Sequence, residues 1–435
     1  MRMLLLAVIY LLAGSGLVLG HTEVHIIEQV VAVDGSNGAD PLQYGSMSDL
    51  SVRHSNENTR LQSRICRRHG SWGHGHPRFR LLNALWGYLS YEELNKVELE
   101  RWRSLYKNTS KKQKKDLEKV VKYTQKLSDI EMLLKKNAEL CQEIVISAMQ
   151  YYEIEQKELE KHMVEQINAG RTADKISVSQ TLKHFVRDWA DEGTKERKDA
   201  FPCLLKIMKG LKGNATQKAR VLLPGSGLSR LGHEVQKLGG FEVTVNEYSV
   251  WMNAAYRYLT SHPQLHSLFF HPFIDGLSHH RTTKDLMRKV TFPNIIPERE
   301  VLLVEGDFTT VFSHEAGSYD VLVTHFFIDT ARNLLNYFET IHSLLKPGGK
   351  WVNLGPLLYG SGPFVQLSLD EIVAVIESMG FTFEKIESGD GPEHVCGEKT
   401  FEDKEIRGTE AEYGFNGKAL TKNAYMAQVW VAKKN

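Results

Sequence analysis

Hydrophobic positions divide the chain into two textures. From Phe79 to about Met163, apolar residues recur at helical spacing with polar residues between them, as in Ile144 and Ala148. This periodicity predicts amphipathic helices. From Ala219 onward, short β-branched runs alternate with helical patterns, which predicts a parallel α/β sheet.

The second texture resolves into individual elements. The expected strands are 220–223, 241–245, 301–304, 319–324, 350–354, 381–385 and 425–432, with helices at 231–238 and 369–379. We therefore expect an α/β fold: a seven-stranded Rossmann-like sheet in a domain of residues 201–435. A helical N-terminal region of residues 79–200 precedes it and contributes to the same site.

The first 78 residues have no sustained period. Residues 1–20 carry one early charge at Arg2 and an apolar run from Met3 to Leu12, followed by small residues, which is typical of a secretory signal peptide. A signal anchor, or an apolar leader added to a cytosolic enzyme, is the alternative interpretation. Residues 21–78 are polar and are expected to be a flexible linker. If the chain enters the secretory pathway, Asn108 and Asn214 lie in N-x-S/T tripeptides that accept glycans.

Composition narrows the class of protein further. The 435 residues include Lys+Arg 54 and Asp+Glu 53, a formal net charge of +1, so no overall field would attract nucleic acid. The apolar run near the N-terminus is too short to predict a stable membrane span. Four cysteines are widely scattered, at positions 66, 141, 203 and 396. With no C-x-x-C pair among them, neither a metal site nor a disulfide is expected.

The strongest chemical signal follows the first expected strand. Residues 223–229 read L-P-G-S-G-L-S, so Gly225 and Gly227 lie in a turn that opens the next helix. Glycine lacks a β carbon and adopts positive φ, which lets the backbone approach a ligand closely. Glu247 ends the second expected strand, where a carboxylate accepts hydrogen bonds from ribose hydroxyls. Ser229 or Arg230 stands near the place of the third glycine of the dinucleotide fingerprint, which favours a nucleoside cofactor without a pyrophosphate there.

Two further motifs support a nucleoside site. Asp307 and Phe308 follow the third expected strand, where a carboxylate can accept from an adenine amino group and a ring can stack on the base. Residues 345–350 read L-K-P-G-G-K and form a tight turn before the fifth strand. In this order, the motifs resemble those of class I S-adenosylmethionine-dependent methyltransferases, so S-adenosyl-L-methionine is the expected cofactor.

Longer strings resemble one family more closely, the carnosine N-methyltransferases. They are F-V-R-D-W at 185–189, L-P-G at 223–225, N-E at 246–247, G-D-F at 306–308, F-F-I-D-T-A at 326–331 and N-L-G-P-L-L-Y at 353–359. The resemblance runs from about Phe79 to the C-terminus. It implies methylation of the imidazole of carnosine to give anserine.

The resemblance also implies cofactor contacts outside the glycine turn. Arg187 matches a family arginine that contacts the cofactor, whereas His184 stands where the family has a glutamine. His325 falls where the fourth strand passes the cofactor, and a buried structural histidine is the alternative role.

For the substrate, the resemblance points to Asp329. A carboxylate at this strand end would accept the N–H of an imidazole, fixing its tautomer and stabilising the cation formed. Capping the following helix is the alternative role of Asp329. Tyr359 and Tyr425 are the other expected substrate contacts, each of which could instead be core. The family motif continues L-L-Y-H, but here Gly360 follows Tyr359, so a different imidazole or small-peptide substrate is an alternative.

Two interpretations of other classes remain: a nicotinamide-dependent oxidoreductase, and a catalytically silent scaffold. The resemblance implies cytoplasm and nucleus as the location, whereas residues 1–20 indicate the secretory pathway. The partner expected is a small molecule or dipeptide rather than nucleic acid, with a possible homodimer through the N-terminal helices.

Overall fold

The computed structural model describes residues 51–435 apart from 215, 361 and 387–394. The expected signal-peptide-like leader of residues 1–20 lies outside these described residues, as does most of the linker. Among the described helices, none is long and apolar enough to cross a membrane.

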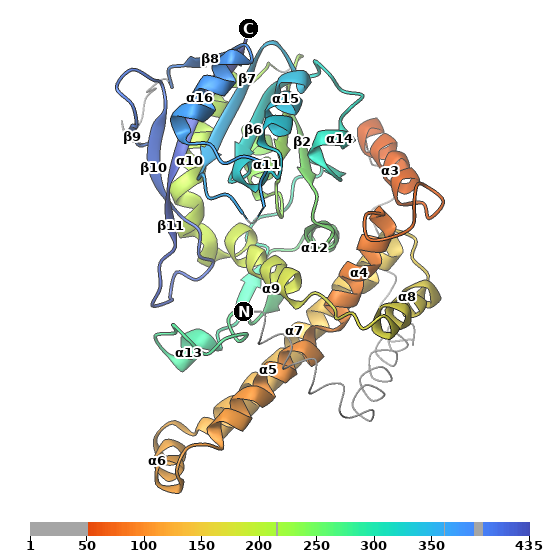
Figure 1. The fold of residues 1–435 in the computed structure, drawn as a ribbon, viewed down its shortest axis with the longest axis vertical. Helices are drawn as coiled ribbons and strands as arrows, with labels where there is room; N and C mark the ends of the chain where they lie inside the picture. Colours follow the sequence, from red (N-terminus) through yellow and green to blue (C-terminus); the bar gives the residue numbers. More distant parts are fainter. Residues whose placement is uncertain (1–50, 215, 361, 387–394) are drawn as a thin grey trace.

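A twisted sheet occupies the upper part of the molecule in Figure 1. Within the described residues it has nine strands, in the order β5-β2-β1-β6-β7-β11-β10-β9, with β8 also paired to β11. The strands are β1 Ala219–Pro224, β2 Phe241–Glu247, β5 Leu302–Glu305, β6 Tyr319–His325, β7 Leu345–Gly355, β8 Phe381–Glu384, β9 Glu398–Lys399, β10 Arg407–Glu412 and β11 Ala424–Lys434. The first five in spatial order are parallel, and β11 is antiparallel to both β7 and β8.

Helices cover both faces of this sheet. They are α10 Thr194–Leu211, α11 Arg230–Lys237, α12 Val250–Ser261, α14 Phe308–Val311, α15 Leu334–Leu344 and α16 Leu369–Ser378. Covered on both sides, the parallel strands are nearly continuous apolar runs, as β1 shows, with five of its six residues buried. A separate antiparallel pair, β3 Leu268–Phe270 with β4 Val290–Phe292, and a short helix α13 Thr283–Leu286 complete this part.

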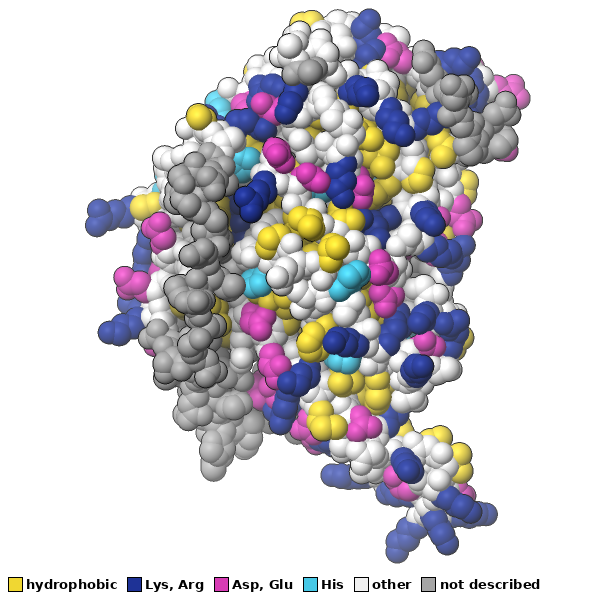
Figure 2. Space-filling model, turned by 180° about the vertical axis from the view of Figure 1, so that it is seen from behind, with side chains coloured by type: hydrophobic (Ala, Val, Ile, Leu, Met, Phe, Trp, Pro, Cys, Tyr) yellow, Lys and Arg dark blue, Asp and Glu magenta, His cyan; other side chains and the backbone are white. Residues whose placement is uncertain are grey.

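The first N-terminal helix packs beside β5, and most of the helices after it form a long arm that extends away from the sheet (Figure 1). The N-terminal helices are α3 Val52–Ile65, α4 Pro77–Leu89, α5 Tyr91–Tyr106, α6 Lys111–Val121, α7 Tyr123–Tyr151, α8 Gln156–Asn168 and α9 Lys175–His184. No residue of α6 is buried, and Figure 2 shows basic side chains projecting from this end of the arm.

The expected α/β fold with a helical N-terminal region is confirmed. All seven expected strands are present, shifted by a few residues at their ends. The L-K-P-G-G turn lies inside β7, because the β6 to β7 register jumps from Tyr319↔Leu345 to Val321↔Lys350, so residues 346–349 loop out. Strands β3, β4, β9 and β10 were not expected.

The expected linker at 21–78 is wrong for its last part. Residues 52–65 form α3, and α4 begins at Pro77. Only Leu61 and Ile65 give α3 buried apolar side chains, so hydrophobic periodicity did not reveal it. Polar contacts hold it instead, since the Arg53 guanidinium donates to Thr244 Oγ1 at 2.8 Å in β2.

The expected boundary at residue 200 is also wrong. Helix α10 runs through it, from Thr194 to Leu211. One apolar core contains side chains from α4 and α7 as well as from β1 and β2, so the arm base and the sheet pack as one body.

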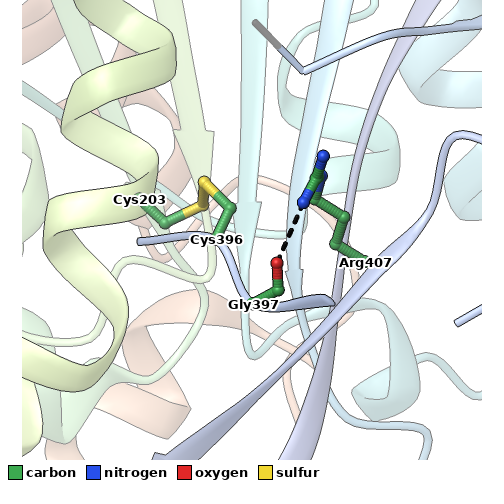
Figure 3. The surroundings of a disulfide bond; sticks show 4 residues. All are labelled: Cys203, Cys396, Gly397 and Arg407. Carbon is green, nitrogen blue, oxygen red and sulfur yellow. Dashed lines mark hydrogen bonds between the residues drawn. A yellow bond between two sulfur atoms is a disulfide. The ribbon is translucent and has the colours of Figure 1, made fainter. Parts of the chain in front are cut away.

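Two cysteines are joined across this body, as Figure 3 shows. Cys203 in α10 and Cys396 just before β9 form a disulfide, with Cα atoms 4.9 Å apart and a sequence separation of 193 positions. The expectation of no disulfide is therefore wrong. The spacing of the cysteines carried no signal, because folding alone brings these two segments together.

A buried ionic cluster attaches the arm to the sheet at the end of β5. Glu305 Oε2 accepts a hydrogen bond from Tyr152 Oη at 2.9 Å, and Glu305 Oε1 accepts from Arg257 Nη2 at 2.8 Å. The Glu305 carbonyl accepts from Arg64 Nη2 at 3.2 Å. One residue thus connects α3, the end of α7 and α12 to the edge of the sheet.

We predict that Glu305→Ala lowers the free energy of unfolding by about 3–5 kcal/mol, because it leaves the Arg257 guanidinium buried without its partner. Urea denaturation followed by circular dichroism measures the loss. Glu410→Ala, which breaks an exposed pair with Lys422, is the matched control and should change the free energy by less than about 0.5 kcal/mol. Equal losses in the two variants would contradict a structural role for the cluster.

Candidate active site

A cavity lies at the carboxyl ends of the parallel strands. Five segments enclose it: the helical turn at 184–188, helix α10, the glycine turn after β1 with the start of α11, the end of β6, and the chain that follows β10. The residues that line it are His184, Arg187, Asp188, Phe201, Gly225, Ser226, Gly227, Arg230, Leu231, His325, Phe326 and Tyr413. Open α/β sheets bind ligands at this edge, where the chain leaves neighbouring strands in opposite directions.

The segment 185–189 is a single π-helical turn that continues α9. Three hydrogen bonds connect its backbone and its tryptophan to α10 and to the start of α11. The Trp189 indole donates to Leu228 O at 2.9 Å, Arg230 Nη1 donates to Asp188 O at 2.6 Å, and Arg197 donates to Arg187 O. A π-helical turn adds a residue and so redirects the side chains on it, which is a frequent device at functional sites.

The glycine turn depends on the absence of a side chain at Gly225. Its φ is +62°, and a β carbon there would lie 2.2 Å from the Phe327 ring. Gly227 also has positive φ, at +55°, and faces His184. The backbone of the turn is therefore open to the cavity, as a close ligand contact requires.

Glu247 contacts the cavity wall through the glycine turn. Its Oε2 accepts from Gly227 N at 2.8 Å, and its Oε1 accepts from Ser249 N at 2.7 Å. The carboxyl is buried, and burial raises its pKa. A buried acid at the end of β2, touching the glycine turn, meets the requirement for a group that accepts from ribose hydroxyls.

Arg187 lies between aromatic rings and acids. Its guanidinium carbon is 3.9 Å from the Tyr413 ring centre, and its Nε is 3.9 Å from Asp188 Oδ1. Burial disfavours ionisation of Asp188, but the hydrogen bond to His184 and the charge of Arg187 leave its pKa lowered. The cavity floor thus carries a fixed cation beside an ionised acid.

His325 presents an unpaired nitrogen. Its Nε2 is buried and has no hydrogen-bond partner, and its ring contacts Phe201 and Phe326 edge to face. Burial, aided by the Arg187 charge, lowers its pKa to about 3, so the ring is neutral. A buried polar atom without a partner beside a cavity indicates a ligand group that pairs with it.

Asp329 lies four residues beyond the end of β6, in a short 3-10 turn Ile328–Thr330. Its carboxyl is buried, and its Oδ2 accepts from Leu358 N at 3.0 Å. Burial raises its pKa from the ordinary value of 3.8 to about 6. It does not cap the next helix, because Asn333 holds that position in α15.

The other expected residues lie outside the lining. Asp307 caps the short α14 by accepting from Thr309 N at 2.9 Å, and Phe308 is buried in a core cluster. The Tyr359 hydroxyl donates to Leu367 O at 2.8 Å and so closes its own loop. Tyr425, at the start of β11, comes nearest through its ring, whose centre is 6.0 Å from that of Phe326.

The structure therefore brings five of the expected residues to one cavity: His184, Arg187, Gly225, Gly227 and His325. Sequence reasoning missed Phe201, Arg230 and Tyr413. Asp188 and Phe326 lie in two of the motifs that carry the family resemblance, F-V-R-D-W and F-F-I-D-T-A. For Tyr413 there was no local signal, because it reaches the site only through the pairing of β10 with β11.

These features define a class of enzyme. Five parallel strands in the order β5-β2-β1-β6-β7, a last strand antiparallel to them, a glycine turn after β1 and an acid ending β2 are the arrangement of class I S-adenosylmethionine-dependent methyltransferases. A nicotinamide-dependent oxidoreductase would instead repeat a parallel βαβ unit in the second half of the sheet.

Comparison with known proteins identifies the family. The family described as "Carnosine N-methyltransferase" matches residues 163–435. The carnosine N-methyltransferase of Mus musculus is 31% identical over 322 residues, which is 70% of this chain and 78% of the mouse protein. That of Schizosaccharomyces pombe is 32% identical over 297 residues, 61% of this chain and 76% of the yeast protein. The chain belongs to the carnosine N-methyltransferase family.

Solved structures show weaker likeness. A Thermotoga maritima S-adenosylmethionine-dependent methyltransferase, described as a possible histamine N-methyltransferase, has 11% identity and a TM-score of 0.32, covering 59% of this chain and 100% of that one. A Haemonchus contortus phosphoethanolamine N-methyltransferase 2 has 16% identity and a TM-score of 0.29, covering 42% of this chain and 37% of that one.

The raised pKa of Asp329 predicts a pH-dependent stability difference. The fold favours the neutral acid, so the protein loses stability as the pH rises from about 4 through about 6. Asp329→Asn does not titrate. The free energy of unfolding of this variant should therefore increase by about 3 kcal/mol relative to the parent across that range. Urea denaturation at a series of pH values measures it. Asp116→Asn, on the exposed helix α6, is the control, and a flat difference for Asp329→Asn would contradict the prediction.

Proposed function

We propose that this chain transfers a methyl group from S-adenosylmethionine to an imidazole nitrogen of carnosine, giving anserine. Family membership supports the substrate and the reaction. The observation that carries the mechanism is the buried carboxyl of Asp329 beyond the end of β6, with a pKa of about 6.

The residues around the cavity fit the cofactor. The glycine turn offers bare backbone, Glu247 a buried acceptor for ribose hydroxyls, and Arg187 a cation for a carboxylate. His325 Nε2 lacks a partner. S-adenosylmethionine, when bound, supplies a methyl group on a positively charged sulfonium.

The aromatic side chains at the cavity have a second task. Phe326 and Tyr413 pack with ring centres 5.0 Å apart, and the Arg187 guanidinium lies over the Tyr413 ring. In-line methyl transfer requires alignment of the nucleophile and exclusion of water. These rings and the guanidinium would close the cofactor side of the site against solvent.

Asp329 would prepare the nucleophile. An imidazole attacks through the nitrogen that carries a lone pair, so its proton must be on the other nitrogen. Above pH 6 the carboxylate accepts that N–H and fixes the tautomer. As the new N–C bond forms and the ring becomes cationic, the carboxylate stabilises the charge and can take the proton.

The loop after β7 governs substrate choice in this proposal. Gly360 is exposed, and a β carbon placed on it would meet no atom within 4 Å. Tyr359 uses its hydroxyl on the backbone of Leu367, so it shapes this loop rather than offering that group to a ligand. Because glycine stands at position 360, groups other than the family's histidine have to bind carnosine. If this chain prefers a different imidazole, that compound will be turned over faster than carnosine.

We predict that purified protein methylates carnosine, and that Asp329→Asn lowers kcat/KM by about 10²–10⁴-fold because the acceptor for the imidazole N–H loses its charge. Mass spectrometry of the product measures the rate. Asp116→Asn, on the exposed helix α6, is the control, with an expected change below threefold. Binding of S-adenosylhomocysteine should be unchanged in both variants. Faster turnover of histidine or histamine than of carnosine would show that carnosine is not the preferred substrate. The absence of methylated product from any imidazole would favour the silent scaffold.

A separate prediction concerns the cofactor. Gly225→Ala adds a β carbon against the Phe327 ring at a residue with positive φ, so we expect at least tenfold weaker S-adenosylhomocysteine binding by calorimetry. Gly210→Ala, inside α10 with no atom within 4 Å of the new carbon, is the matched control and should bind normally. Thermal melts verify that both variants fold. Unchanged binding in Gly225→Ala would exclude the turn from the cofactor site.

A further inference from the structure

The disulfide between Cys203 and Cys396 joins two parts of the active-site wall. Both cysteines are buried, at 0% and 5% exposure, and their Cα separation of 4.9 Å lies within the range found for disulfides. Two residues before Cys203, Phe201 lines the cavity. Beyond Cys396, the chain forms β9 and β10 and leads directly to Tyr413.

The segment that Cys396 begins is closely fitted. Gly397 has φ +73°, and a β carbon there would lie 1.9 Å from Gly408 O. Arg407 Nη1 donates to Gly397 O at 3.0 Å, as Figure 3 shows. The fit holds Cys396 next to α10.

Helix α10 also contacts the end of β10 and the residues after it through polar side chains, including an ion pair between Lys195 and Glu412. Glu412 N donates to Asp199 Oδ2 at 3.2 Å, and Gly414 N donates to Glu196 Oε1 at 3.3 Å. These bonds lie on either side of Tyr413 in sequence. The disulfide thus adds a covalent attachment between α10 and the strands that lead to Tyr413.

The remaining cysteines are left as thiols: Cys66 is exposed and Cys141 is buried. A buried structural disulfide persists in oxidising compartments and is rare in the cytosol. In the secretory pathway, this chain would also present a glycan acceptor. Asn108, in the tripeptide Asn108-Thr109-Ser110, is exposed in the connection between α5 and α6, at the far end of the helical arm (Figure 1).

We propose that the chain matures in the secretory pathway, where Cys203 and Cys396 are oxidised to the disulfide and Asn108 receives an N-linked glycan. The apolar pattern of residues 1–20 agrees with this route. The two thiols release two protons and two electrons to a disulfide-bearing oxidant of the compartment, which becomes a dithiol. In glycan transfer, the Asn108 amide nitrogen forms a bond to the first sugar carbon of a lipid-pyrophosphate-linked oligosaccharide. The bond from that carbon to the pyrophosphate breaks, and the amide loses a proton.

Glycan analysis tests the first half on the full chain expressed in cultured animal cells. We expect N-glycosidase to lower the mass of the purified protein, and Asn108→Gln to remove one glycan from it. Asn423→Gln, an exposed asparagine outside any N-x-S/T tripeptide, is the control and should keep the full mass. A chain that stays in the cytosol without glycan, or one glycosylated on Asn214 alone, would overturn the assignment of Asn108.

Thiol labelling tests the second half on the same protein. Maleimide should modify Cys66 in the native state, Cys141 only after denaturation, and the other two cysteines only after reduction. Cys203→Ser and Cys396→Ser should each lower the melting temperature by several degrees, and the double variant by no more than either. Labelling of Cys203 or Cys396 before reduction, or additive losses of stability, would refute the bond. These readouts do not involve methyl transfer, so they stand apart from the proposed reaction.

Discussion

The site depends on the contact between the π-helical turn at 185–189 and the start of α11. The Trp189 indole donates to Leu228 O, and the Arg230 guanidinium donates to Asp188 O. In each bond, a side chain of one segment pairs with a backbone carbonyl of the other. Buried backbone carbonyls need such partners. Because each carbonyl finds its partner on the other segment, neither turn can shift alone, and Arg187 stays fixed against the Tyr413 ring.

Burial sets the electrostatic character of the groups around this contact. The cavity holds a cation at Arg187 and an ionised Asp188, while burial keeps His325 neutral. Outside the cavity, burial shifts the pKa of an acid in the opposite direction, and the pKa of Asp329 rises to about 6. Desolvation disfavours whichever form is charged, so one physical cause lowers the pKa of the histidine and raises that of the acid. The second shift places Asp329 within the range in which an imidazole titrates.

Residues from the helical N-terminal region and from the C-terminal strands complete a site that the parallel sheet forms only in part. The parallel strands bring the glycine turn, Glu247 and His325 to one edge. The end of α9 and the π-helical turn after it add His184 and Arg187, and the chain after β10 adds Tyr413. Helix α10 connects to the segment that carries Tyr413. Its Asp199 and Glu196 accept hydrogen bonds from the backbone of Glu412 and Gly414, and its Cys203 forms the disulfide with Cys396.

The sequence by itself determined the parallel sheet, the helical region before it, and the positions of the glycine turn and Glu247, whereas Arg187 was indicated only by the family resemblance. These depend on residues a few positions apart: an apolar period, a positive φ that only glycine adopts freely, and a polar residue at a strand end. Only the tertiary structure decided that α3 is a helix, that Tyr413 lines the cavity, that Tyr359 bonds to its own loop and that Cys203 meets Cys396. Contacts such as the disulfide join residues as much as 193 positions apart, and chain separation of that kind leaves no local pattern, because only the packed fold sets which surfaces meet.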